Sequence, residues 1–263
     1  MMSQPQIYVY CIIDSAAEIN DLVGGYRIYS IPWMECSAIV SDFEKPADMK
    51  EHIKEYALTH EKVAELMMNR FTVLPMRLLT IAADREKVLA LLKENYDDFK
   101  GNFLRLAQKM EFGLKVLWPA AQIRERLRSA CKTKETEEVT PGVSPAKMFM
   151  KNKFDIYKVE KAFHAEAEKY IAAIDEFFSG IAVEKKLQKL PTEKMLLNAS
   201  YLVEKSRWAE VNPVFEKLRN AQPGLVYQFS GPWPAYNFIV MEKKNSSDAG
   251  SGMSDVLNKF LEY

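Results

Sequence analysis

The stretch HEKVAELMMNRFTVLPMRLLTI (60–81) decides the fold class, because it changes from a helical to a β pattern. From Asp48 onward, apolar residues recur at alternating four- and three-residue steps, which predicts one face of an amphipathic helix: Met49, Ile53, Tyr56, His60, Val63 and Met67. FTVLPMRLLTI (71–81) is then β-rich. Pro75 cannot donate a ladder hydrogen bond, so it predicts an edge position, a bulge or a strand end. The stretch therefore indicates a mixed α+β protein.

Strands are predicted on the N-terminal side of this helix. QIYVYCII (6–13) is rich in β-branched and aromatic side chains. Gly24-Gly25 marks a turn, and YRIYSI (26–31) and CSAIVSDF (36–43) supply one or two more strands.

A helix and a strand are predicted on the C-terminal side. Asp84 is a candidate N-cap for a second long helix that runs to about Lys109, and MEFGLKVLW (110–118) is a strand. Pro119 is well placed to open a further helix. This element order predicts that residues 1–130 form an α+β domain related to the ferredoxin-like fold, with helices on one face of an antiparallel sheet.

A second α+β domain is predicted over residues 146–243. Residues 131–145 are polar and end in two prolines and a glycine, as expected of a linker or exposed loop, and residues 244–263 are expected to form a mobile tail. A helix longer than average is indicated by apolar residues at helical spacing: Ile156, Val159, Phe163, Tyr170, Ile174, Phe177 and Ile181.

The rest of this domain is predicted to alternate strand and helix. KMLLNASYLVE (194–204) is a strand, and WAEVNPVFEKLRNA (208–221) is a helix with Pro213 in its first turn. GLVYQFSGPWPAYNFIVME (224–242) is predicted to form two strands around a proline-rich bend.

The composition excludes several classes of protein. The 36 basic and 36 acidic residues cancel, whereas a protein that grips nucleic acid normally carries a cationic surplus. No window is apolar for long enough to cross a membrane, and the N-terminus reads as a strand and not as a signal peptide. Three widely spaced cysteines suit reduced thiols in the cytoplasm, and Cys11 and Cys36 are predicted to be buried.

The common signatures of chemistry are missing from the sequence. There is no GxGxxG, GxxxxGK, GxSxG or HExxH motif. Of the three histidines, His52 and His60 lack a partner at metal-ligand spacing and His164 follows Phe163 on a charged helix. His60 lies on the apolar stripe and is predicted to be a hydrogen-bonded core residue. We therefore predict no catalytic, cofactor-binding or metal-binding residues.

The motif GPWPAYNF (231–238) has the greatest potential for binding a partner. Its two prolines restrict the backbone, so Trp233, Tyr236 and Phe238 would lose little entropy on binding. Tryptophan and tyrosine are also enriched in binding hot spots. The alternative is that Trp233 covers a core and the prolines fix a corner between strands, and the two roles are compatible.

Met76 and Arg77 are two further candidates for partner contacts. Methionine adapts to irregular apolar partners, although core packing is the preferred interpretation for Met67, Met68 and Met76. If residues 71–81 form a regular strand, Arg77 points away from Met76. It could then meet an acidic partner or form a salt bridge between domains, and we favour the internal role.

Two passages resemble the gas vesicle protein F/L family. HEKVAELMMNRFTVLPMRLLTI with KMEFGLKVLW (109–118) is similar to the family's "vLPvrFG" and "E..vk..W" strands. LNASYLVEKSRWAEVNPVFEKLRNAQPGLVYQFSGPWPAYNFI (197–239) is similar to its "N.aYLV" strand and "GPWPPYsF" hairpin. The matches run in order over about nine tenths of the chain. Leu78 and Leu79 stand where the family often has Phe-Gly, and Ala235 replaces a common proline.

The resemblance implies a non-enzymatic accessory protein of gas vesicle assembly, with a ferredoxin-like-related N-terminal domain and a second α+β domain. Its implied partners are the small hydrophobic shell protein (GvpA-type) and other accessory proteins, without a cofactor. Its implied location is the cytoplasm, in association with gas vesicles. An F-type and an L-type member are both compatible with the sequence.

Two other function classes remain open on the sequence. The fold class alone would suit an α+β enzyme or a small-ligand-binding protein, such as a haem dismutase-like protein. A nucleic-acid binder is disfavoured by the charge balance.

Overall fold

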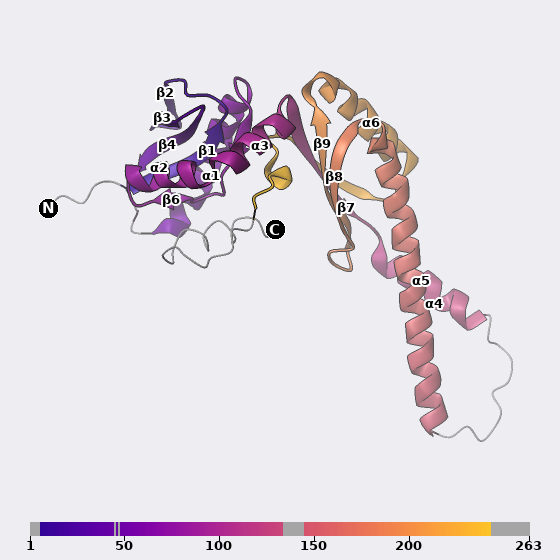
Figure 1. Ribbon diagram of the computed structural model, residues 1–263. Helices are drawn as coiled ribbons and strands as arrows, with labels where there is room; N and C mark the ends of the chain where they lie inside the picture. Colours follow the sequence, from indigo (N-terminus) through magenta and orange to yellow (C-terminus); the bar gives the residue numbers. More distant parts are fainter. Residues whose placement is uncertain (1–5, 45, 47, 134–144, 243–263) are drawn as a thin grey trace. The chain divides into compact units, whose positions relative to one another are not determined.

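The chain divides into two compact units, one of which is inserted into the other. The computed structural model describes residues 6–44, 46, 48–133 and 145–242 (Figure 1). Unit 1 combines the chain up to Glu111 with the segment from Pro232 onward, and unit 2 comprises Phe112–Gly231. The domain border predicted at residue 130 would fall inside a helix. The second domain was predicted to extend to residue 243, whereas unit 2 ends at Gly231. The predicted linker lies almost entirely outside the described residues, and the predicted tail lies wholly outside them.

Unit 1 contains a six-stranded sheet in the order β2-β3-β4-β1-β5, with β6 also paired to β1. Its pairings β1–β4, β1–β5, β1–β6, β2–β3 and β3–β4 are antiparallel. The elements are β1 (Gln6–Ile13), β2 (Asn20–Val23), β3 (Tyr26–Trp33), β4 (Cys36–Phe43), α1 (Met49–Met68), β5 (Val73–Pro75), β6 (Ile81–Ala82), α2 (Arg85–Glu94), α3 (Tyr96–Leu106) and the 3-10 helix η2 (Tyr236–Phe238).

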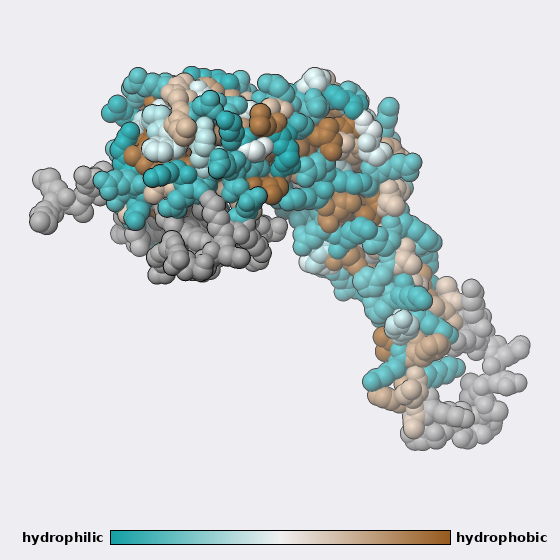
Figure 2. Space-filling model, viewed as in Figure 1, coloured by the Kyte–Doolittle hydropathy of each residue, from teal (hydrophilic) through white to brown (hydrophobic). Residues whose placement is uncertain are grey.

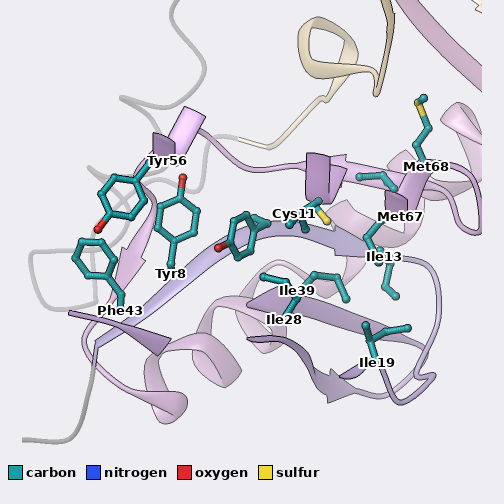
Figure 3. Packing of buried hydrophobic residues seen from close by; sticks show 13 residues of the cluster. Tyr8, Cys11, Ile13, Ile19, Ile28, Ile39, Phe43, Tyr56, Met67 and Met68 are labelled. Carbon is teal, nitrogen blue, oxygen red and sulfur yellow. The ribbon is translucent and has the colours of Figure 1, made fainter. Parts of the chain in front are cut away.

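α1 packs on one face of this sheet, where aromatic rings of β1 meet those of the helix. The ring centroids of Tyr8 and Tyr56 are 6.2 Å apart (Figure 3). A β-bulge between Val9 and Cys11 lets Cys11 join the same buried cluster as Tyr8 and Tyr10. The cluster continues to Met67, so the predicted core role of this methionine is confirmed.

The opposite face of the sheet is buried as well, in place of the single covered face expected from the sequence. β1 is buried from Ile7 to Ile13, although successive side chains of a strand point to opposite faces. α2 contacts β3 and β4 and contributes three buried residues: Val88, Leu91 and Leu92. A strand that is buried on both faces reads as a continuous apolar run, which is the pattern of VYCII.

Two predicted elements of unit 1 are broken in the structure. Residues 71–81 do not form one strand, because the chain leaves β5 at Pro75 and turns before β6. The second helix starts after its predicted N-cap, since Asp84 accepts a hydrogen bond from the Lys87 amide at 2.8 Å. It ends before Asn95, whose backbone amide and side-chain nitrogen both donate to the Leu91 carbonyl, and α3 begins at the next residue.

Unit 2 has the element order β-α-β-β-α-β of the ferredoxin-like fold, with two helices in the first helical position. The four strands are ordered β10-β7-β9-β8. The elements are β7 (Lys109–Leu117), α4 (Ala120–Thr133), α5 (Pro145–Ser179), β8 (Ala182–Lys189), β9 (Met195–Glu204), the 3-10 turn η1 (Lys205–Arg207), α6 (Trp208–Ala221) and β10 (Val226–Trp233). The predicted α+β class and long second-domain helix are confirmed.

The core of unit 2 lies between its sheet and the C-terminal half of α5. Phe112 of β7 packs against Phe178 of α5 and Tyr201 of β9, with ring centroids 5.2 and 5.0 Å away. At the start of α4, Trp118 packs on Phe163 of α5 at 4.7 Å and donates its indole N–H to the Glu193 carbonyl. Aromatic contacts therefore hold α5 within unit 2 at two positions, Phe163 and Phe178.

Three details of unit 2 differ from the sequence-based expectation. β8 (AVEKKLQK) was not predicted, because its side chains are charged and mostly exposed. Pro213 lies beyond the first turn of α6, which begins at Trp208. Residues 224–242 form one strand followed by a 3-10 turn, because Pro232 and Pro234 lack the amide protons that a second paired strand needs.

No helix in the described part of the chain is long and apolar enough to span a membrane. Its three cysteines are free thiols, and Cys11 and Cys36 are buried as predicted.

Candidate functional site

A buried carboxylate anchors the C-terminal segment to unit 1. Glu111, in β7, accepts hydrogen bonds from the backbone amide of Asn237 at 2.9 Å and from its side-chain amide at 2.5 Å. The backbone amides at the start of a short helical turn carry partial positive charge, which suits a carboxylate. Glu111 therefore fixes η2 at its first turn.

Two residues of α3 secure the same segment further along. Asn102 accepts from the Val240 amide at 2.9 Å and donates to the Val240 carbonyl at 2.6 Å. Arg105 donates to the carbonyl of Phe238, whose side chain is fully buried. Residues 236–240 are thus held by side chains from α3 and from the first residues of β7.

The backbone of GPWPAYNF is restricted before it reaches these anchors. Gly231 adopts φ 126°, a left-handed conformation that strongly favours glycine. The Tyr236 amide donates to the Pro234 carbonyl at 2.7 Å, and the Phe238 amide donates to the Ala235 carbonyl at 3.1 Å. This short turn fixes where the Trp233 and Tyr236 side chains project.

His60 of α1 forms the centre of a chain of buried hydrogen bonds. Its Nε2 lies 3.0 Å from the Met76 carbonyl and its Nδ1 lies 2.9 Å from the Tyr8 hydroxyl. Because a carbonyl can only accept, Nε2 carries the proton and Nδ1 accepts from Tyr8. The Tyr8 oxygen in turn accepts from the Leu79 amide at 3.0 Å. The prediction of a hydrogen-bonded core histidine is confirmed, and burial lowers the pKa of His60 to about 4.

The backbone turns at the LPMR motif (74–77), whose Met76 carbonyl is the last acceptor in this chain of hydrogen bonds. The Met76 amide still pairs with the Tyr10 carbonyl at 2.9 Å. Thr80 then donates twice to the Arg77 carbonyl, from its amide at 3.1 Å and its hydroxyl at 2.7 Å. Leu79 adopts φ 65°, a left-handed conformation that is costly for a leucine and that glycine adopts without strain.

These elements surround one open, largely apolar pocket of about 180 Å³ in unit 1. Its lining comes from α1, from the turn after β5 and from the GPWPAYNF motif: Ala57, His60, Glu61, Leu78, Trp233 and Tyr236. The two most distinctive motifs of the sequence, far apart along the chain, therefore meet at this surface.

The candidate contact residues divide into two groups around the pocket. Trp233 is partly buried and lines it, and Tyr236 lines it with 37% of its surface exposed. Phe238 and Met76 are buried, so they lie beneath this surface. Arg77 is partly buried in the turn beside Leu78 and not on a regular strand. Their role as partner contacts remains a prediction.

Sequence reasoning did not select the residues that support the pocket. Glu111, Asn102 and Arg105 position the motif, and Glu61 and Leu78 complete the lining. Glu111 was available as the glutamate of the "E..vk..W" pattern. Its function could not be seen because Asn237 is remote in sequence.

The titratable side chains that line the pocket are His60, Glu61 and Tyr236. Both ring nitrogens of His60 are engaged within the protein, and the described residues contain no cluster that could hold a metal ion. Burial is the largest cause of the raised pKa of Tyr236, with smaller contributions from Cys11, Tyr8, Glu61 and Glu111, so the phenol stays neutral near pH 7. The pocket thus presents two aromatic side chains, one of them a hydrogen-bonding phenol.

Residues 6–240 match a family model described as gas vesicle synthesis protein GvpL/GvpF. The chain belongs to this family. This GvpL/GvpF chain is 22% identical over 244 residues to gas vesicle protein F2 of Halobacterium salinarum, a match that covers 90% of the chain and 94% of the relative. It is 26% identical over 213 residues to gas vesicle protein F of a Streptomyces species, covering 77% and 84%.

Two solved structures share the fold of this GvpL/GvpF chain. Gas vesicle protein GvpF from Anabaena sp. PCC7120 superposes with a TM-score of 0.72 at 18% identity, covering 91% of this chain and all of the other. GvpF from Microcystis aeruginosa gives a TM-score of 0.71 at 17% identity, covering 90% of this chain and all of the other.

Proposed function

We propose that this chain is a non-enzymatic accessory protein of gas vesicle formation that binds the hydrophobic shell protein (GvpA-type) and other accessory proteins. It acts in the cytoplasm in association with the vesicle. The family description and the names of its relatives support the link to gas vesicles. The observation that carries the binding role is the pocket at which Trp233 and Tyr236 meet α1.

The physical argument rests on preorganisation. Binding costs the entropy of every side chain and loop that it immobilises. Here Glu111, Asn102 and Arg105 already hold the segment that carries the aromatic residues. A bound apolar side chain would therefore gain contact with Trp233 and Tyr236 at a small entropic cost.

A haem-binding or other small-ligand role finds less support in this site. His60 is the histidine at the pocket, and neither of its nitrogens is available to a ligand without breaking a buried hydrogen bond. The partly open, largely apolar surface suits a protein side chain better than a charged metabolite.

The proposal is tested by capturing co-expressed gas vesicle components with the tagged full-length protein. We expect the shell protein to be retained, and Trp233→Ala to reduce its retention about tenfold or more, as at a hot spot. Trp33→Ala is the matched control, because Trp33 is a partly buried tryptophan of unit 1 outside the pocket. Circular dichroism verifies that both variants are folded.

Each result of this experiment has a defined meaning. If Trp33→Ala and Trp233→Ala reduced retention of the shell protein equally, the pocket would be removed from the proposal. Retention of the shell protein by both variants would assign the contact to another surface. Failure of the unaltered protein to retain any vesicle component would overturn the accessory role.

A further inference from the structure

The N-terminal half of α5 carries many large apolar side chains on its surface. The residues more than half exposed are Met148, Phe149, Met150, Phe154, Ile156 and Tyr157. Figure 2 shows hydrophobic residues in brown and tan between hydrophilic residues in teal along this helix. A helix that is apolar around much of its circumference is normally covered on more than one side.

Two apolar faces can be separated by helical spacing. Phe149 and Ile156 continue the face of Phe163, which packs on Trp118 at the start of α4. Met150, Phe154 and Tyr157 follow each other at steps of four and three on a different face. These last three residues, here named the α5 stripe, are 66%, 56% and 62% exposed.

Lysines border the α5 stripe on both sides. By helical geometry Lys151 and Lys158 lie along one border and Lys153 along the other. The Lys158 ammonium group lies 4.5 Å from the ring centroid of Phe154. The Lys153 ammonium group lies 4.9 Å from the ring centroid of Phe149. The stripe is therefore an apolar strip with two lysines along one border and one lysine along the other.

Lysines outnumber carboxylates in this part of α5. Residues 145–161 contain five lysines but only two carboxylates, Asp155 and Glu160. Glu160 pairs with Arg124 of α4. Asp155 lies at helical spacing from Lys151 and Lys158 and offsets part of their charge, so the excess of lysines over carboxylates remains but is not complete. The local charge at the stripe is thus positive, although the whole chain is neutral.

We propose that the α5 stripe binds an amphipathic helix of a partner protein, whose own apolar stripe is bordered by aspartate or glutamate on both sides. Such a helix would bury Met150, Phe154 and Tyr157 and place its carboxylates opposite the lysines. This surface lies in unit 2, apart from the pocket of unit 1, and does not depend on the function proposed for that pocket.

Charge and composition exclude two other occupants. A second copy of α5 would bring like-charged lysine rows together, which disfavours pairing. The sequence 134–144 (KETEEVTPGVS) between α4 and α5 has only two aliphatic side chains, both valines, too few to cover three large residues. A separate acidic, apolar helix meets both requirements.

The test uses the full-length protein and a fluorescein-labelled synthetic helix with a leucine stripe bordered by glutamates. A matched peptide has lysines in place of the glutamates. Fluorescence anisotropy should show that the acidic peptide binds at least tenfold more tightly than the basic one, and that added salt weakens its binding. The triple change Met150→Ala, Phe154→Ala and Tyr157→Ala should weaken binding of the acidic peptide at least tenfold.

Two further variants show whether the stripe itself is the site. Met148→Ala removes an exposed methionine from another face of the same helix and should leave binding unchanged. The double change Lys151→Glu and Lys158→Glu should weaken binding of the acidic peptide and strengthen binding of the basic peptide. Because all these side chains lie on the surface, circular dichroism should show native helix content throughout.

Three outcomes would overturn the proposal. Equal binding of the two peptides would indicate unspecific apolar adhesion. An unchanged affinity in the triple variant would place the contact elsewhere. Binding to phosphatidylglycerol vesicles without binding to the acidic peptide would identify an anionic lipid surface as the occupant.

Discussion

At the scale of single residues, the core of unit 1 contains a chain of hydrogen bonds in which the donor and the acceptor of each bond are defined. The Leu79 amide donates to Tyr8, Tyr8 donates to His60, and His60 donates to the Met76 carbonyl. Because these groups are buried, removing one member leaves its neighbours without partners.

We expect Tyr8→Phe to lower the free energy of unfolding by about 2–4 kcal/mol, since both the Leu79 amide and His60 Nδ1 lose a partner. Urea-induced unfolding measures this change. Tyr29→Phe is the matched control: Tyr29 donates to Asp42 at 2.8 Å in an exposed pair, and its loss should cost below about 0.5 kcal/mol. Similar costs in the two variants would contradict the assigned role of Tyr8.

Stability should also depend on pH through His60. Its pKa is about 4 in the folded protein against 6.5 for the ordinary side chain. Between these values the unfolded chain binds more protons than the folded chain. The contribution of His60 to the free energy of unfolding is therefore complete above pH 6.5 and is lost as the pH falls toward 4. From pH 7.5 to 5.0 we expect a loss of about 2 kcal/mol from this residue. Urea unfolding of His60→Gln at both pH values should lack this part of the decrease, and an identical pH dependence would refute it.

At the scale of elements, residues 236–240, which follow β10, are ordered by side chains and not by sheet pairing. In Glu111→Ala the Asn237 amides lose this buried acceptor. Hydrogen–deuterium exchange at 236–240 should then be about tenfold faster or more, while β9 keeps its protection. Glu61→Ala, an exposed change at the pocket, serves as the control and should leave exchange at 236–240 unaltered. Unaltered exchange in Glu111→Ala would show that Asn102 and Arg105 suffice.

Elements with a strong period could be predicted from the sequence, and those that depend on remote contacts could not. α1, α6 and the buried strands β1 and β9 follow from apolar spacing. The break at Asn95 carries a local side-chain hydrogen bond to the Leu91 carbonyl, which the apolar spacing does not reveal. In the turn after Pro75, the Leu79 amide donates to Tyr8, which is 71 residues away in the sequence, and local sequence does not contain this contact.

The candidate site was predictable to a similar extent. The proline and tryptophan pattern was sufficient to select Trp233 and Tyr236, which line the pocket. It could not show that Phe238 is buried beneath them, nor that α1 supplies the other wall. Those facts require knowing that Glu111 lies beside Asn237.

At the scale of the whole molecule, unit 2 is an insertion in unit 1. β7 and β10 are neighbours in one sheet, and an added Cβ on Gly113 would lie 2.8 Å from the Ser230 hydroxyl oxygen. The chain therefore leaves and re-enters unit 1 at adjacent points, which is a common arrangement for inserted domains.

We expect a chain in which a short Gly-Ser linker joins Glu111 to Pro232 to fold cooperatively as unit 1. A chain that stops after Gly231 should still fold unit 2. The free energy of unfolding of unit 1 should fall by several kcal/mol, because Phe238 is fully buried there. Thermal unfolding followed by near-ultraviolet circular dichroism distinguishes the two. Native stability of unit 1 in the shortened chain would show that the returning segment is dispensable.

The insertion also sets the order of events on the ribosome. Residues up to Glu111 are synthesised first but lack the strand end and turn that complete their unit, which arrive only after all of Phe112–Gly231. At bacterial to eukaryotic translation speeds this delay is on the order of ten seconds. During that time the inserted domain can finish folding, while the first-made part still exposes the apolar surface that Phe238 will cover. Unit 1 is thus begun before unit 2 during synthesis but is completed only after it.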